Sequence, residues 1–212
     1  MKRITLVLMA LTVVIFVMSF SAWGGAKKES ALNGGSLSYG EYGRPATLDP
    51  ITSNEMISLR LAELIFNGLV GINEKQEIIP ELAERWERSS DGRTYTFYLR
   101  KDVTWHPREG EEPKPFTADD VIFTYKIMMH PKTITPLKVR YEFIDTVEKL
   151  NDYTVKFTLK RPILNALAKF SFKVIPKHGP SNPTYLTRDD AFVQNPIGTG
   201  PYLLKEITAE RE

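Results

Sequence analysis

The three histidines of this chain are the first candidates for metal ligands. His106, His130 and His178 each stand directly before a proline or a glycine, which is typical of loops. A metal-binding pair on a helix needs two histidines four positions apart, or a comparable cluster with carboxylates or cysteines. The sequence has no such spacing, so it disfavours a metal site, one for nickel included.

Hydrolytic chemistry has little support either. The acidic residues Glu109, Glu111 and Glu112 lie in a proline-flanked loop, whereas a glycosidase holds two carboxylates on a rigid frame. There is no cysteine, no Gly-x-Ser-x-Gly and no His-Glu-x-x-His. Gly198-Thr199-Gly200 lacks the Gly-Lys-Ser/Thr ending of a phosphate loop, and we interpret it as a structural turn with Tyr202 packed behind it. We therefore expect no enzymatic activity, no cofactor and a solvated surface at the acidic loop.

Two helices and several strands are expected to position these residues. Residues 55–66 carry apolar side chains at helical spacing, with Ser53 or Asn54 as the cap and Asn67-Gly68 as the stop. A second helix is predicted from Thr117, which forms a capping box with Asp120, to the residue before Pro131.

Strict alternation of apolar and polar side chains predicts two half-buried strands, residues 94–100 and 153–160. Asp91-Gly92 closes a hairpin before the first, and Asn151-Asp152 supplies the turn before the second. Shorter strands are expected at residues 36–42 and 173–175, and a short helix at residues 162–170. This mixture indicates an α/β or α+β fold.

The first residues have the order of a secretory signal peptide. Lys2 and Arg3 precede an uncharged apolar run, and small residues up to Ala26 offer a cleavage site. The run is also close to the length of a membrane span, so an uncleaved anchor is the alternative. Both readings place the rest of the chain outside the cytoplasm, and we expect the periplasm.

The charge balance excludes a nucleic-acid-binding role. The chain has 28 Lys and Arg against 26 Asp and Glu, and Lys2 and Arg3 account for the excess. The exported part is thus formally neutral, with no basic field to attract nucleic acid or acidic lipid. Without cysteine it has neither disulfides nor a lipid-modified cysteine after the leader.

The stretch from Ala83 to Asp102 resembles the signature of the family 5 extracellular solute-binding proteins, the peptide- and nickel-type receptors of ABC importers. Its Asp-Gly turn, the alternating Thr-Tyr-Thr-Phe-Tyr-Leu strand and the final Arg-Lys-Asp carry the resemblance. Further matching segments follow the family's order: Thr47-Leu48-Asp49-Pro50, Ile65-Phe66-Asn67-Gly68-Leu69-Val70, Pro80-Glu81-Leu82-Ala83-Glu84-Arg85-Trp86, Phe116-Thr117-Ala118-Asp119-Asp120-Val121 and Pro196-Ile197-Gly198-Thr199-Gly200-Pro201-Tyr202.

The resemblance implies a periplasmic-binding-protein-like type II α/β fold, with two lobes around a cleft and a subdomain inserted in lobe one. On that pattern residues 1–26 are the signal peptide and 27–71 begin lobe one. Residues 72–176 form the inserted subdomain, and 177–212 return to lobe one. Relatives continue well beyond this length, so we expect an incomplete fold, either a fragment or a natural truncation.

The resemblance also implies a function. Such proteins bind a ligand and pass it to ABC permease subunits, and we expect a monomer that takes short peptides, with nickel complexes or oligosaccharides as alternatives. The loop after Leu-Asp-Pro runs beside the ligand in peptide-binding relatives, which carries the role over to Ser53, Asn54, Glu55 and Met56. A purely structural reading makes Asn54 a helix cap and Met56 a core residue. The competing function is a truncated receptor remnant or an exported interaction module.

Overall fold

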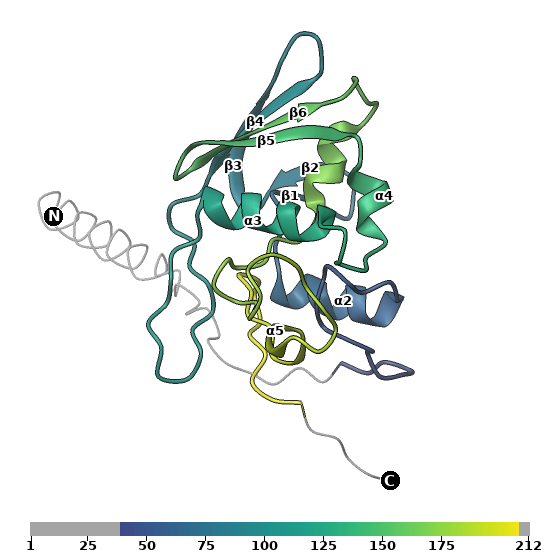
Figure 1. The fold of residues 1–212 in the computed structure, drawn as a ribbon, viewed down its shortest axis with the longest axis vertical. Coiled ribbons are helices and arrows are strands. Elements are labelled where there is room, and N and C mark those ends of the chain that lie inside the picture. The colour runs from purple at the N-terminus through teal and green to yellow at the C-terminus, as the bar shows by residue number, and fades with distance from the viewer. Residues whose placement is uncertain (1–38, 208–212) are drawn as a thin grey trace, which may run out of the picture. The chain divides into compact units, whose positions relative to one another are not determined.

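A four-stranded antiparallel sheet is the largest element of the computed structural model, which describes residues 39–207 (Figure 1). Its strand order is β3-β4-β6-β5, with bounds Ala83–Arg88, Thr94–Leu99, Thr154–Leu159 and Ile144–Asn151. The chain divides into two units, residues 1–40 and 41–212, and the second holds all the elements below. The expected signal peptide lies outside the described residues.

The hairpin of β3 and β4 confirms the prediction from the Asp91-Gly92 turn. Gly92 has a φ of +68°, a conformation that glycine adopts without steric cost. Tyr95, Phe97 and Leu99 are buried while their neighbours on β4 are half-buried, as the alternation required. Aromatic side chains therefore line the covered face of the sheet.

The second hairpin matches the prediction for β6 but differs in its turn. Asn151 ends β5 and pairs with Thr154, so Asp152 and Tyr153 form the two-residue connection. Strand β5 was not predicted because, after Ile144, nearly all of its side chains are exposed. An edge strand of this kind gives no alternating pattern to recognise.

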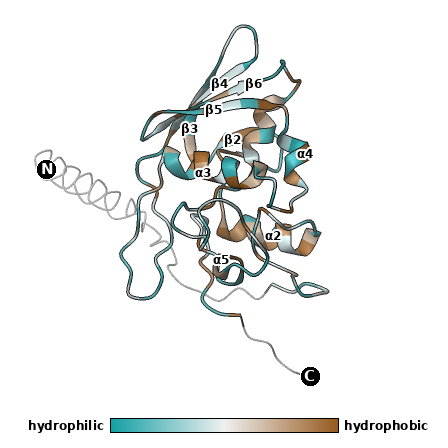
Figure 2. Cartoon of the chain, viewed as in Figure 1, coloured by the Kyte–Doolittle hydropathy of each residue, from teal (hydrophilic) through white to brown (hydrophobic). Residues whose placement is uncertain are grey.

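Helix α3, Ala118–Met129, packs against the sheet and begins with the expected capping box (Figure 1). The buried Asp120 carboxylate accepts the Thr117 N–H at 2.9 Å, the Lys177 N–H at 2.8 Å and the Trp105 indole N–H at 3.3 Å. Trp105 is therefore a core residue rather than a surface for stacking a ligand. The loop between Trp105 and α3 is mostly hydrophilic (Figure 2).

Phe170 closes the core on the aromatic face of the sheet. Its ring centroid lies 5.4 Å from that of Tyr95, 4.7 Å from that of Phe97 and 4.8 Å from that of Phe157. Phe170 belongs to a 3-10 helix, η1, Ala166–Ser171, which starts later than the helix predicted at residues 162–170. Asn165, with a φ of +55°, interrupts the helical path directly before it.

Helix α2, Met56–Ile65, confirms the first predicted helix, but its cap is different. Glu55 is the N-cap, so the expectation that Ser53 or Asn54 caps the helix is wrong. The helix ends with the Phe66 N–H bonded to the Ala62 carbonyl at 2.9 Å, just before Asn67.

The remaining elements are β1 at Val70–Ile72, paired with β2 at Ile78–Pro80, and the short helices α4 at Leu137–Tyr141 and α5 at Ala191–Gln194.

The Gly198–Tyr202 turn satisfies the C-terminal carbonyls of α2. The Gly200 N–H donates to the Ile65 carbonyl at 2.8 Å, and the Tyr202 N–H donates to the Leu64 carbonyl at 3.0 Å. The structural interpretation of this motif is thus confirmed. Tyr202 itself is 51% exposed, so the expectation that it is packed is wrong.

Two short strands predicted from sequence are not seen in the described residues. Of residues 36–42, only 39–42 are described, and they are irregular. Residues 173–175 make a single hydrogen bond to another backbone group, from the Val174 N–H to the Asn67 carbonyl at 3.0 Å, and join no sheet. Within residues 39–207, no helix has the length and apolar character needed to cross a membrane.

Candidate functional site

The loop that joins Thr47 to α2 is organised by the side chain of Asp49. This buried carboxylate accepts the N–H groups of Ile51 and Thr52, each at 2.9 Å, and the Thr52 hydroxyl at 2.5 Å. The Asp49 N–H donates to the Thr47 hydroxyl at 3.0 Å. These contacts form an Asx-type turn that fixes the direction in which the chain leaves Thr52.

Three further hydrogen bonds hold the loop at its ends. The Thr135 hydroxyl donates to the Ile51 carbonyl across 84 residues of sequence. Glu55 accepts the Ser58 hydroxyl at 2.5 Å and also the Ala46 N–H, which ties the start of α2 to the chain before the turn. The segment from Ser53 to Glu55 is therefore anchored on one side through Ile51 and on the other through Glu55.

The four residues predicted to bind ligand have different environments. Ser53 is 4% exposed, and its hydroxyl is buried without a hydrogen-bond partner among the described residues. Asn54 is exposed, and Glu55 is half-buried with one carboxylate oxygen engaged by Ser58. Met56 is 62% exposed, so the alternative that it is a core residue is wrong.

The backbone of Ser53 and Asn54 is unpaired within the described residues. Across residues 39–207, no hydrogen bond involves the N–H or C=O groups of Ser53 and Asn54. Glu55 is extended, with φ −108° and ψ +148°. Polar backbone groups in native proteins normally find partners, and an extended segment with free N–H and C=O groups can receive another chain as an added strand.

A pH-dependent contribution to stability is expected from Asp49. Burial raises the pKa of its carboxyl above the ordinary value, so the folded state holds the proton more tightly than the unfolded state. The contribution of Asp49 is then most favourable at acid pH and declines as the pH rises through the folded pKa. Asp49→Asn is always neutral, so its deficit in unfolding free energy relative to wild type should shrink between about pH 4 and pH 7.

Glu55→Gln is the matched control, measured by urea denaturation over a pH range that also extends below 4.5, the ordinary pKa of a glutamate. The hydrogen bond from Ser58 lowers the pKa of Glu55, so its contribution is present at neutral pH and lost as the pH falls. The two variants should therefore show opposite slopes against pH. A constant deficit for Asp49→Asn would contradict the effect assigned to burial.

The residues first considered for chemistry do not gather into a site. The Nε2–H of His106 donates to the Gly200 carbonyl at 2.8 Å, and His130 stacks on Tyr185 with ring centroids 5.5 Å apart. His178 lies edge-on to Trp105. In the described part of the chain, no group of three or more histidine, cysteine, aspartate or glutamate side chains could hold a metal ion.

Sequence reasoning missed the brace from residues 133–135. Thr135 bonds the loop directly, and the neighbouring Ile134 is 81% exposed. The buried Thr133 hydroxyl accepts the Leu186 N–H at 3.2 Å, which fixes this brace to the later part of the chain. A Thr-x-Thr-Pro run is common in loops, so no local signal singles it out.

Comparison with known proteins identifies a family match over most of these elements. The family described as bacterial extracellular solute-binding proteins, family 5 Middle, matches residues 77–212. The oligopeptide-binding protein AppA of Bacillus subtilis is 31% identical over 220 residues, a match that covers 97% of this chain and 40% of that protein. The chain thus spans less than half the length of this relative.

Solved structures show the same partial coverage. AppA from Bacillus subtilis in complex with a nonapeptide matches with a TM-score of 0.69 and 29% identity, over 79% of this chain and 33% of that one. NikZ from Campylobacter jejuni in complex with Ni(L-His) matches with a TM-score of 0.68 and 34% identity, over 78% and 32%. Both support a periplasmic-binding-protein-like fold of which this chain covers part.

Proposed function

Because this chain belongs to the family 5 bacterial extracellular solute-binding proteins, we propose that it is part of a periplasmic receptor that binds short peptides and delivers them to an ABC permease. Members of this family bind solutes and are not enzymes. The peptide complex of AppA supports a peptide as the ligand class, and the Ni(L-His) complex of NikZ defines the competing class.

The observation that carries this proposal is the unpaired backbone of Ser53 and Asn54 in the described part of the chain. A peptide offers N–H and C=O groups at regular spacing, so it can pair with these groups whatever its side chains are. The exposed side chains of Asn54 and Met56 flank the segment, and Asp49 holds its start in place before ligand arrives. Such preorganisation reduces the entropy lost on binding.

In the proposed mechanism, the 51–56 loop forms part of one wall of a cleft between two lobes. Ligand enters the open form, and hinge bending closes the second lobe over it. The ligand drives closure only to the extent that it binds the closed form more tightly. The closed form then docks on the permease, and ATP hydrolysis by another subunit powers transport.

We further propose that residues 27–71 and 177–212 belong to lobe one and that residues 72–176 are its inserted subdomain. The sheet, α3 and η1 all fall inside the proposed subdomain. The bond from the Gly200 N–H to the Ile65 carbonyl joins the two proposed pieces of lobe one.

Calorimetric titration of the intact exported protein tests the function. Unmodified tripeptides are expected to bind saturably, whereas tripeptides N-methylated along the backbone should bind more weakly because they lose N–H donors. Nickel with histidine and maltotriose serve as probes of the competing ligand classes. Saturable binding of either competitor without any binding of peptides would overturn the peptide assignment.

A further inference from the structure

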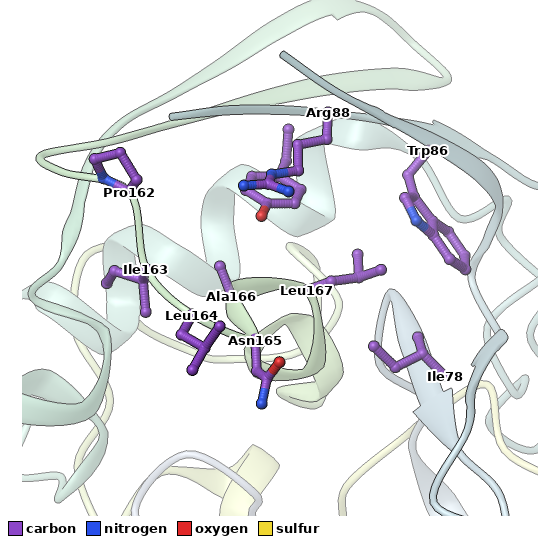
Figure 3. Close-up of a pocket in the computed structure, with 10 residues that line it drawn as sticks. Ile78, Trp86, Arg88, Pro162, Ile163, Leu164, Asn165, Ala166 and Leu167 are labelled. Carbon is purple, nitrogen blue, oxygen red and sulfur yellow. The ribbon is translucent and has the colours of Figure 1, made fainter. Parts of the chain in front are cut away.

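A pocket of about 460 Å³ opens on the sheet, away from the 51–56 loop. Trp86 and Arg88 of β3 line one side, and residues 162–167 face them (Figure 3). Ile78 of β2 closes the end beside Trp86. The volume falls in the range of small-molecule sites, and none of its lining residues belongs to the proposed peptide-binding loop.

The pocket exists because η1 covers only part of the aromatic face. Trp86 pairs with Phe97 and Arg88 pairs with Tyr95, so the side chains of all four share the face on which Phe170 packs. Strand β3 is at the edge of the sheet, and η1 begins only after Asn165. The corner between β3 and Asn165 is left without a covering side chain.

The rim of this corner keeps apolar side chains in contact with solvent. Leu164 is 88% exposed, and Ile163 and Leu167 are only partly buried. Asn165 adopts a left-handed conformation between Leu164 and η1, which sets where the chain turns towards the core. An apolar ligand in the pocket would remove part of this surface from water.

Arg88 is the one residue with a full charge in the pocket lining. Its guanidinium lies beside the Asp91-Gly92 turn, with Nη2 2.4 Å from where a Cβ on Gly92 would stand. In the part of the chain that the structure describes, no carboxylate lies within ion-pair distance of it. A planar guanidinium with free donors binds carboxylates through two parallel hydrogen bonds.

We propose that this pocket binds an aliphatic carboxylate. The hydrocarbon chain lies against Trp86, Ile78 and Leu167, and the carboxylate pairs with Arg88. The branched aliphatic side chains favour a hydrocarbon chain, and the unpaired cation selects its acidic end. This site is separate from the peptide-binding loop, so either assignment can fail without the other.

Three probes with the same eight-carbon chain test the proposal on the intact wild-type protein. Octanoate should change Trp86 fluorescence saturably and bind about tenfold more tightly than octanol, because only the carboxylate pairs with Arg88. Octylammonium should bind more weakly than octanol because its charge repels the guanidinium. Equal binding of all three would show a nonspecific apolar surface and overturn the proposal.

Two variants on one strand locate the charge that is responsible. Arg88→Met keeps an unbranched side chain but removes the guanidinium, so it should weaken octanoate binding about tenfold while leaving octanol binding unchanged. Arg85 lies on β3 as Arg88 does, but its guanidinium stacks on Tyr98 outside the pocket. Arg85→Met should therefore leave both affinities unchanged. Undiminished octanoate binding by Arg88→Met would overturn the assignment, and the three-probe comparison holds even if a variant fails to fold.

Discussion

Replacing Gly198 with alanine is expected to lower the free energy of unfolding by about 3 kcal/mol or more. A Cβ at this position would stand 1.8 Å from the Ile65 carbonyl oxygen, far inside any permitted contact. The obstacle is backbone at the end of α2, so no side-chain rotation can relieve it. The glycine turn must move away, and its hydrogen bond from the Gly200 N–H to Ile65 is then stretched or lost.

Gly43→Ala is the matched control for this substitution. Its added Cβ would meet only the Cδ1 of Ile57, at 3.2 Å, and that side chain can shift. Neither glycine has a left-handed φ, so backbone strain does not distinguish them. Urea denaturation of the intact protein should show a change within about 1 kcal/mol for Gly43→Ala. A similarly small change in unfolding free energy for Gly198→Ala would mean that close packing of this turn against the end of α2 does not contribute to stability.

The elements predicted correctly from sequence are those whose signal is local. Strand β4 alternates residue by residue, and Gly92 marks its turn, so a few positions determine the hairpin. The Thr117 and Asp120 capping box is equally local, since its two partners are three residues apart. Such local patterns can be recognised in the sequence without knowledge of the rest of the fold.

The errors arise where tertiary contacts decide the outcome. Residues 173–175 read as a strand, but Val174 finds only the Asn67 carbonyl and no neighbouring strand. Residues 162–170 read as a helix, but Asn165 takes a left-handed conformation and delays its start. Strand β5 gave no pattern because pairing with β6, rather than burial of its side chains, holds it in the sheet.

The candidate loop remains a prediction from sequence, and its geometry could not be predicted. The Leu-Asp-Pro turn is a local feature, because the Asp49 carboxylate accepts hydrogen bonds from the N–H groups of Ile51 and Thr52. The difference between a buried Ser53 and an exposed Met56 depends on how α2 packs, which no neighbouring residue encodes. The contact from Thr135 to Ile51 spans 84 residues and is invisible to any local pattern.

Replacing Asn54 with proline is expected to weaken peptide binding about 10- to 100-fold. Proline removes the N–H of this residue and with it one donor to the main chain of the ligand. The ligand carbonyl that would have accepted it is left unsatisfied in a closed cleft, which is the costly way to lose a hydrogen bond. Titration of the intact protein with an unmodified tripeptide measures the effect.

Asn54→Ala separates the backbone from the side chain at the same position. Alanine keeps the N–H and removes only the exposed amide, so it should bind peptide within about threefold of wild type if pairing runs through the main chain. The Asn54 N–H has no partner among residues 39–207, so neither substitution breaks a described backbone hydrogen bond, and thermal melting of both should stay close to wild type. Equal affinity for Asn54→Pro and wild type would exclude strand-like pairing here, whereas equal losses for proline and alanine would assign the contact to the Asn54 side chain instead.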